Sequence, residues 1–228
     1  MESMAELERK QIRILDRIEN LENRCLNLQS ASLCSPPTHT STSAYNSTET
    51  RLSAILESKG VTNFSFKRVP SDYYNQPLEY RRDSLGATSV DHLCKSIVLV
   101  NTQAPPEIIG CTDRHYSKYY IVVVQYIARF NAEMVKNYLY TLNGGKIPKK
   151  KFNMRLAPEE TSAELTGYEH NAVTCIGLKM EIPVILDKAI VKLKPEMFWL
   201  GGGEVDLKLG INTSQFINCV NPFIVSCS

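Results

Sequence analysis

Residues 119–127, Tyr-Tyr-Ile-Val-Val-Val-Gln-Tyr-Ile, constrain the fold more than any other segment of the chain. β-Branched and aromatic side chains favour a pleated strand, and the run is apolar on both faces, as in a strand that is covered on both sides. It is too short to cross a bilayer, which takes about 20 apolar residues. Pro105, Pro106 and Asp113 are turn-forming residues that separate it from the preceding apolar segment. The run therefore predicts a strand at the centre of a sheet.

Other segments predict helices and strands that follow one another irregularly. Leu52, Ile55 and Leu56 have helical spacing, and Gly60 behind them favours the end of a helix. The sequence predicts helices over residues 49–59, 131–142, 158–167 and 214–219, the end of a helix at 89–94, and strands over 61–69, 97–100, 183–186 and 205–209. This order favours a mixed α+β sheet over a doubly wound one.

The N-terminal 30 residues contain a narrow apolar seam with helical spacing. Its positions are Met4, Leu7, Gln11, Ile14, Ile18, Leu21, Cys25 and Leu28. Charged residues flank the seam, which is typical of a coiled coil, and Gln11 is a polar exception of the kind that fixes register or oligomeric state. The alternative is an amphipathic helix that packs onto its own domain. A coiled coil over 1–30 requires a partner helix, from a second copy or from another chain.

Residues 31–48 are rich in Ser, Thr and Pro and include Pro36-Pro37. Such a composition buries little apolar surface and predicts a flexible linker. The remaining residues, 49–228, are then expected to form one globular domain.

Composition limits the class of protein. The net charge of +2 is too small to indicate a nucleic-acid-binding protein by itself. The first ten residues lack the apolar core of a secretory signal, and no segment is long enough to span a membrane. The seven cysteines are odd in number and include no Cys-x-x-Cys pair, which suits free thiols in a reducing compartment. We expect a cytoplasmic protein without contact with a membrane.

Common catalytic motifs are absent from the sequence. The four histidines and seven cysteines show no metal-ligand spacing, so neither a metal nor another cofactor is expected. Gly201-Gly202-Gly203 lacks the Gly-Lys-Ser/Thr that completes a phosphate-binding loop, and it is more simply interpreted as a tight turn before a strand. No Gly-x-Ser-x-Gly elbow is present.

Lys95 stands immediately before the apolar run Ile97-Val-Leu-Val100. A lysine at the edge of a core is partly desolvated when it lies in a cleft, which suits a functional role. The alternative is a solvated residue at the entry of the strand.

A basic cluster follows the helix predicted over 131–142. It comprises Lys146, Lys149, Lys150, Lys151 and Arg155. Such a cluster neutralises nucleic-acid phosphates and releases their counterions. A turn that merely keeps the protein soluble explains the same residues equally well.

The order of elements from Leu52 to Ile217 resembles the YbaK family and the related editing domains of prolyl-tRNA synthetase. The resemblance rests on Cys94-Lys-Ser-Ile-Val-Leu-Val100, on the central strand, on Leu165-Thr-Gly-Tyr168 with the loop Glu169-His-Asn-Ala-Val-Thr-Cys-Ile-Gly177, on Ile182-Pro-Val-Ile-Leu186 and on the glycine turn. In the family, the loop has the form Gly-x-x-x-Pro followed by a second glycine. Gly177 fits the second glycine, whereas Asn171 replaces the first and Cys175 replaces the proline.

The resemblance implies a mixed, largely antiparallel sheet flanked by helices and preceded here by the coiled-coil helix. It also implies a catalytic role for Lys95, which would stabilise negative charge as the tetrahedral intermediate forms. The residues it implies for substrate binding are Gly167, His170, Asn171, Ala172, Val173, Thr174, Gly177, Gly201 and Gly202. Asparagine tolerates left-handed backbone better than most residues, so the loop is expected to survive at Asn171. Cys175 lacks the fixed φ of proline.

The function that the resemblance implies is metal-independent hydrolysis of mischarged aminoacyl-tRNA in trans. The alternative is a non-catalytic tRNA-binding or assembly module tethered through its coiled coil. The expected partners are aminoacyl-tRNA, bound by the basic cluster, and a coiled-coil partner, either a second copy or a component of a synthetase complex.

Overall fold

The computed structural model describes residues 47–108, 110–111 and 113–228, which belong to one compact unit. The predicted coiled-coil helix at 1–30 and most of the predicted linker lie outside the described residues. Among the described helices, none is long and apolar enough to span a membrane.

A five-stranded sheet forms the centre of the domain, in the order β4-β2-β3-β5-β8. Its strands are β2 (Cys94–Asn101), β3 (Tyr119–Gln125), β4 (Met154–Leu156), β5 (Val184–Asp187) and β8 (Phe223–Val225). β3 is the middle strand, and residues 120–125 are all buried. The prediction of a central strand from residues 119–127 is confirmed. The β3–β5 and β5–β8 pairings are parallel, and β2 is antiparallel to both of its neighbours.

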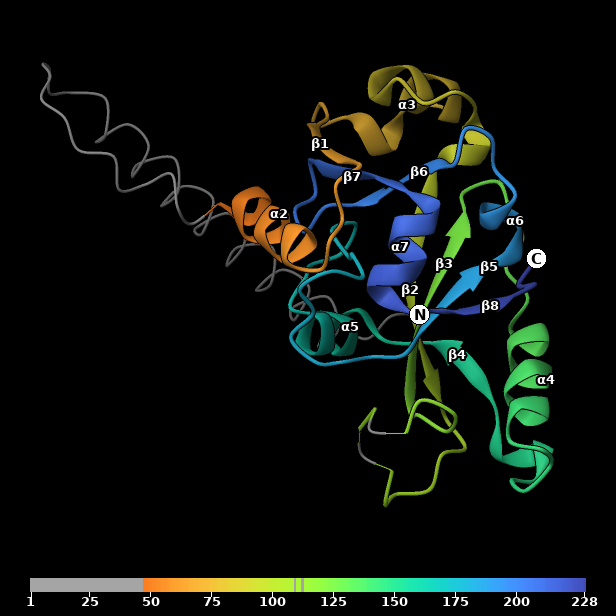
Figure 1. Cartoon of the computed structure of the whole chain (residues 1–228). Coiled ribbons are helices and arrows are strands. Elements are labelled where there is room, and N and C mark those ends of the chain that lie inside the picture. The colour runs from red at the N-terminus through yellow and green to blue at the C-terminus, as the bar shows by residue number, and fades with distance from the viewer. Residues whose placement is uncertain (1–46, 109, 112) are drawn as a thin grey trace, which may run out of the picture. The chain divides into compact units, whose positions relative to one another are not determined.

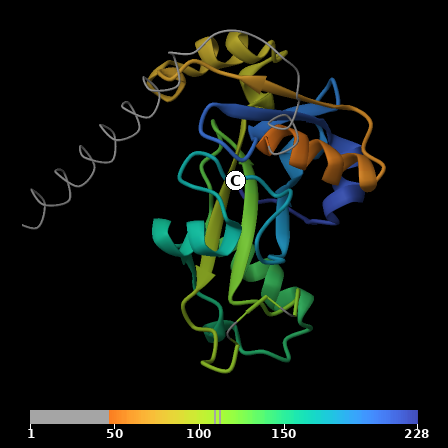
Figure 2. The same ribbon diagram turned by 90° about the vertical axis from the view of Figure 1, so that its left-hand side faces the viewer.

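A second, three-stranded sheet lies across one end of the first (Figure 2). It consists of β1 (Phe64–Arg68), β7 (Leu207–Asn212) and β6 (Met197–Gly201), paired antiparallel in the order β1-β7-β6. A single bridge between Leu93 and Trp199 links the two sheets. The mixed, largely antiparallel character agrees with expectation, but the division into two sheets and the strand at 197–201 were not predicted from the sequence.

Helices cover both faces of the five-stranded sheet (Figure 1). α4 (Ala132–Leu142) packs Val135 and Leu139 on one face. On the other face lie α2 (Thr48–Ser58), α5 (Glu159–Thr166), α6 (Lys188–Val191) and α7 (Thr213–Val220). Asn131 caps α4 as predicted, because its side chain accepts a hydrogen bond from the amide of Glu133 at 3.0 Å.

The segment between the two sheets differs from the sequence prediction. Residues 89–94 were expected to end a helix, but they form the short 3-10 turn η3 (Val90–His92) and enter β2. The helix of this region is α3 (Leu78–Leu85), which stops at left-handed Gly86. Before it comes another 3-10 turn, η2 (Tyr73–Asn75). α3 has the sequence Leu-Glu-Tyr-Arg-Arg-Asp-Ser-Leu, whose apolar positions are too few to show a helical face.

Candidate functional site

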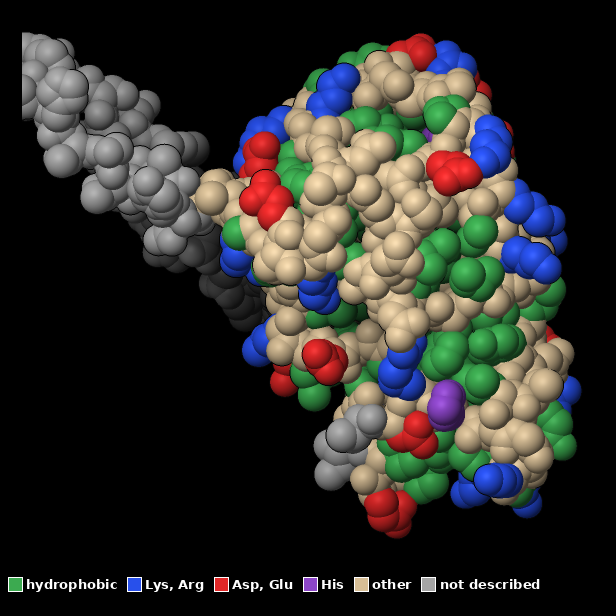
Figure 3. Space-filling model, in the orientation of Figure 1, with side chains coloured by type: hydrophobic (Ala, Val, Ile, Leu, Met, Phe, Trp, Pro, Cys, Tyr) green, Lys and Arg blue, Asp and Glu red, His purple; other side chains and the backbone are tan. Residues whose placement is uncertain are grey.

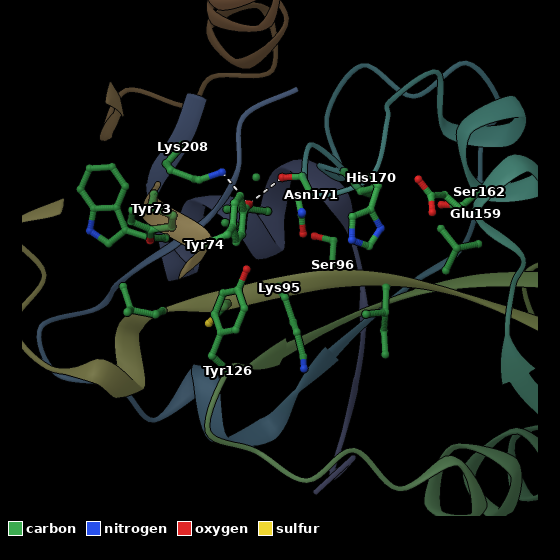
Figure 4. Close-up of a pocket in the computed structure, with 18 of the residues that line it drawn as sticks. Tyr73, Tyr74, Lys95, Ser96, Tyr126, Glu159, Ser162, His170, Asn171 and Lys208 are labelled. Carbon is green, nitrogen blue, oxygen red and sulfur yellow. Dashed lines mark hydrogen bonds between the residues drawn. The ribbon is translucent and has the colours of Figure 1, made fainter. Parts of the chain in front are cut away.

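A cavity of about 360 Å³ opens at the junction of the two sheets (Figure 4). Its walls come from η2, the N-terminal half of β2, the start of α5, the loop that follows α5, β6 and β7. Five of the predicted site residues line it, namely Lys95, His170, Asn171, Val173 and Gly201. Residues that are far apart in the sequence therefore meet here.

The open edge of β2 forms the floor of the cavity. β4 pairs only with residues 99–101 of β2, and Val98 accepts one further hydrogen bond from the amide of Ala157 at 2.9 Å. In the described structure no strand pairs with residues 94–97 on this side. Backbone groups of a strand that lack a partner strand are available to a ligand.

Lys95 and Ser96 project from opposite sides of β2, as neighbouring residues of a strand must. Figure 4 shows Ser96 on the side of Asn171 and His170, with Lys95 on the other side. The Lys95 ammonium lies 5.6 Å from the centroid of the Tyr126 ring, which is a cation–π distance. Lys95 thus lines the cavity with its ammonium over the ring of Tyr126.

The loop between Gly167 and Gly177 depends on left-handed backbone at three positions. Gly167 has φ 77° and Gly177 has φ 64°. Asn171 also has positive φ, at 66°, although it is not glycine. Asparagine tolerates this region better than most residues because its short polar side chain is compatible with it. The structure thus shows at Asn171 the left-handed backbone that the expectation requires.

Gly201 allows the loop to pack directly against β6. A Cβ atom added at Gly201 would lie 2.4 Å from the carbonyl oxygen of Val173. The neighbouring amide of Gly203 donates to the carbonyl of Ala172 at 3.0 Å. The contact is therefore one of backbone with backbone, which only glycine permits. Gly202, by contrast, is buried, and its amide donates to Leu207 at 2.9 Å.

α2 supports the loop from behind. The Arg51 guanidinium donates to the carbonyl of Gly177 at 3.3 Å and to the Tyr168 hydroxyl at 3.2 Å. Tyr168 in turn donates to the carbonyl of Ile176 at 2.6 Å. A Cβ atom at Gly177 would lie 2.7 Å from Nη1 of Arg51. Gly167 and Gly177 thus shape the loop outside the cavity rather than line it.

Several amides of the loop have no acceptor within the described residues, and among them those of His170, Asn171 and Val173 belong to residues that line the cavity. The amide of Ala172 donates to Glu169 at 3.0 Å, and Thr174 is fully buried. Asn171 and Val173 line the cavity, and within the described part of the chain their amides have no acceptor. Two such donors at one cavity are suited to bind a developing negative charge on oxygen.

The thiols beside the cavity are protonated. Burial raises the pKa of Cys94 well above its usual value and that of Cys175 to about 12. The Cys175 sulfur lies 3.9 Å from the Ser96 hydroxyl. Because the thiolate is the reactive form, neither cysteine is prepared to act as a nucleophile. No group of three or more metal-ligating side chains occurs in the described ranges.

Lys208 and Tyr74 are site residues that sequence reasoning missed. The Lys208 ammonium donates to the Tyr74 hydroxyl and to the carbonyl of Val205, each at 2.7 Å. Tyr74 donates onward to the carbonyl of Asn171 at 2.7 Å (Figure 4). Lys208 is only 4% exposed, and burial lowers its pKa to about 8. Lys208 on β7 is therefore connected by hydrogen bonds through Tyr74 to Asn171, the loop residue with positive φ.

The predicted basic cluster lies outside the cavity, with its lysines in the connection between α4 and β4 and Arg155 in β4. Lys149–Lys151 form the 3-10 turn η4, and all five cations of the cluster are exposed. Lys149 lies 3.5 Å from Glu133. β4 joins the cluster to the cavity, since Leu156 at its end lines the cavity. In Figure 3, Lys and Arg side chains and acidic side chains are interspersed over the visible face.

Comparison with known proteins identifies the family and supports the fold. The family described as "aminoacyl-tRNA editing domain" matches residues 87–219, more than half of the chain. No curated protein sequence matches. A solved structure named as a candidate trans-editing enzyme for prolyl-tRNA synthetase superposes with a TM-score of 0.60 at 17% identity, covering 80% of this chain and 98% of the other. A hypothetical protein superposes with a TM-score of 0.57 at 17% identity, covering 78% and 98%. The chain belongs to the aminoacyl-tRNA editing domain family.

Proposed function

We propose that the chain hydrolyses mischarged aminoacyl-tRNA in trans, without a metal ion. The observation that supports the proposal is the loop at the cavity, where Asn171 adopts a left-handed backbone and the amides of Asn171 and Val173 have no acceptor within the described residues. These amides and the cavity of about 360 Å³ suit the ester at the 3′ end of an aminoacyl-tRNA.

In this mechanism, water attacks the ester carbonyl carbon. The carbonyl oxygen becomes an oxyanion, which the amides of Asn171 and Val173 stabilise. The bond to the ribose oxygen then breaks, and that oxygen takes a proton derived from the water. The products are a free amino acid and an uncharged tRNA. Because the cavity's thiols are protonated, the protein's contribution is to position the water and the ester.

The basic cluster is proposed to hold the acceptor arm of the tRNA. Its lysines are exposed, and β4 leads from them to the cavity at Leu156. An arm bound there by its phosphates would direct its 3′ end toward the open edge of β2.

One observation favours the alternative of a non-catalytic module. Lys95 and Ser96 project from opposite sides of β2, so the Lys95 ammonium lies over Tyr126 rather than beside the amides of Asn171 and Val173. If the Lys95 ammonium keeps this position when tRNA is bound, Lys95 contributes to tRNA binding and not to hydrolysis.

A deacylation assay on a panel of mischarged tRNAs tests the proposal. If the Lys95 ammonium turns from Tyr126 to the ester when tRNA binds, we expect Lys95→Ala to abolish hydrolysis with little loss of stability, because the substitution removes a positive charge at the cavity without opening the core. Lys118→Ala is the matched control: its ammonium lies 5.8 Å from the centroid of the Tyr119 ring, at the opposite end of the β2–β3 pair. Near wild-type rates for Lys95→Ala would remove Lys95 from the mechanism. No hydrolysis of any substrate by the wild-type protein, with tRNA still bound, would establish the alternative.

A further inference from the structure

One end of the cavity is built from tyrosines and cations. Tyr73, Tyr74, Tyr126 and Lys208 line it, and Arg81, which does not line the cavity itself, lies 5.5 Å from the three ring centroids. The Lys208 ammonium lies 4.5 Å from the centroid of the Tyr74 ring. The acidic residue that lines the cavity, Glu159, stands at the opposite end of the row of side chains in Figure 4. The ammonium of Lys208 and the carboxylate of Glu159 therefore lie at opposite ends of the cavity.

One N–H donor of Lys208 has no hydrogen-bond acceptor among the described residues at this end of the cavity. A lysine ammonium carries three N–H donors, and Lys208 uses two of them on uncharged acceptors, the Tyr74 hydroxyl and the Val205 carbonyl. The nearby carboxylate of Asp206 forms an ion pair with Arg68, at 2.8 Å. Within the described ranges, no carboxylate forms an ion pair with Lys208.

A buried ammonium without a contacting anion is unfavourable, and an anion that enters the cavity relieves it. Lys208 is 4% exposed, so it can meet only a small group that enters deeply. In an aminoacyl-tRNA, the amino acid is at the tip of the 3′ end and enters first. The tyrosines around Lys208 exclude water and strengthen the attraction between the two charges.

We propose that Lys208 is the specificity-determining residue of the cavity and that it selects aminoacyl groups with a carboxylate side chain. The proposal rests on the proposed function, because it names the substrate class of that same cavity. An acidic side chain would accept the third N–H of Lys208, while the ester stays near the free amides of the Asn171 loop. A charged hydrogen bond of this kind contributes enough to raise affinity by roughly 10- to 100-fold.

Binding of adenosine analogues that carry the amino acid through an amide instead of an ester tests the proposal without hydrolysis. Aspartyl, asparaginyl and leucyl analogues have side chains of nearly the same shape but decreasing acceptor strength. By calorimetry we expect the aspartyl analogue to bind at least about tenfold more tightly than the leucyl analogue. Lys208→Met should abolish or reverse this preference, and Lys208→Gln should remove the preference for aspartyl over asparaginyl.

Lys67→Met is the matched control. Lys67 pairs with Lys208 across the β1–β7 ladder, on the same face, but is exposed to solvent. Its variant should keep the wild-type order of affinities. A leucyl preference in the wild-type protein, or an aspartyl preference that survives in Lys208→Met, would overturn the proposal.

Deacylation of the three corresponding tRNAs separates this inference from the proposed function. Hydrolysis without a preference for the aspartyl ester would keep the function and overturn the inference. An aspartyl preference in binding that Lys208→Met abolishes, with no ester hydrolysed, would keep the inference and overturn hydrolysis.

Discussion

Asn171 shows how a single backbone angle determines the shape of the cavity. Its φ of 66° is compatible with glycine and asparagine and unfavourable for a β-branched residue. We expect Asn171→Gly to retain deacylation. Asn171→Val should lower the free energy of unfolding by about 1–3 kcal/mol and abolish most activity, because the loop must distort. Chemical denaturation and rate measurements on both variants check this. Equal loss of activity in the two variants would show that the asparagine side chain, not the backbone shape, is required.

The buried ammonium of Lys208 makes stability depend on pH. Its pKa is about 8 in the folded protein against 10.5 as the usual value. Below pH 8 both states are protonated, and the cost of burying the charge is fully present. As pH rises from 8 toward 10.5, the folded state loses its proton first, so the cost diminishes.

We therefore expect the free energy of unfolding of the wild-type protein to rise relative to Lys208→Met across this pH range, by on the order of 3 kcal/mol at most. Urea denaturation of both proteins at matched pH values measures the difference. A difference that stays constant with pH would mean that Lys208 is not desolvated in solution.

The two lysines of the cavity differ in how far sequence could identify them. The resemblance to a known family indicated Lys95. Lys208 alternates with Leu207 and Leu209, so a local pattern places it on the face of a strand that is usually solvated. Its cover comes from Tyr74, 134 residues earlier in the chain. Burial produced by such a distant segment leaves no local signal.

At the scale of elements, the η4 turn and its neighbours are expected to supply the electrostatic part of tRNA binding. Replacing Lys149, Lys150 and Lys151 together by alanine should weaken binding and flatten its dependence on salt, by about one unit of the log–log slope for each lost phosphate contact. Fluorescence titrations at several salt concentrations provide the measurement.

Three exposed lysines around α6, Lys188, Lys192 and Lys194, are the matched control for the same number of charges. Their triple alanine variant should leave the slope unchanged. If both triple variants flatten the slope equally, the effect belongs to the net charge and not to the η4 turn.

Elements with a clear local sequence pattern could be predicted, whereas those that depend on contacts between distant segments could not. β3 and α4 have strong local patterns, and α5 begins after proline and ends at glycine, so sequence predicted them. α3 is polar and was missed. The division into two sheets depends on the pairing of β1 with β7, which no local pattern specifies.

At the scale of the whole molecule, α2 belongs to the site although it lies at the start of the described residues. Deletion of residues 1–30 should reduce the size of any oligomer or complex and leave the deacylation rate unchanged, because the domain keeps α2 and its cap Ser47. Deletion of residues 1–59 should abolish activity, since it removes Arg51 from Gly177 and Tyr168.

Light scattering and rate measurements on the three proteins check this prediction. Equal monomeric masses for the full chain and the chain without residues 1–30, alone and with cell extract, would exclude a coiled coil in that segment. Full activity without residues 1–59 would show that the loop needs no support from α2.

The position of β7 between β1 and β6 has a consequence for synthesis on the ribosome. β1 lies near the start of the described chain and β7 near its end, so the three-stranded sheet closes only when these distant segments meet. Contacts of such long range form slowly. A nascent chain that has emerged as far as β5 contains Lys95 and Asn171, but it lacks the Gly201 wall and Lys208. The growing protein therefore acquires its binding cavity in one late step, after its last strands have left the exit tunnel.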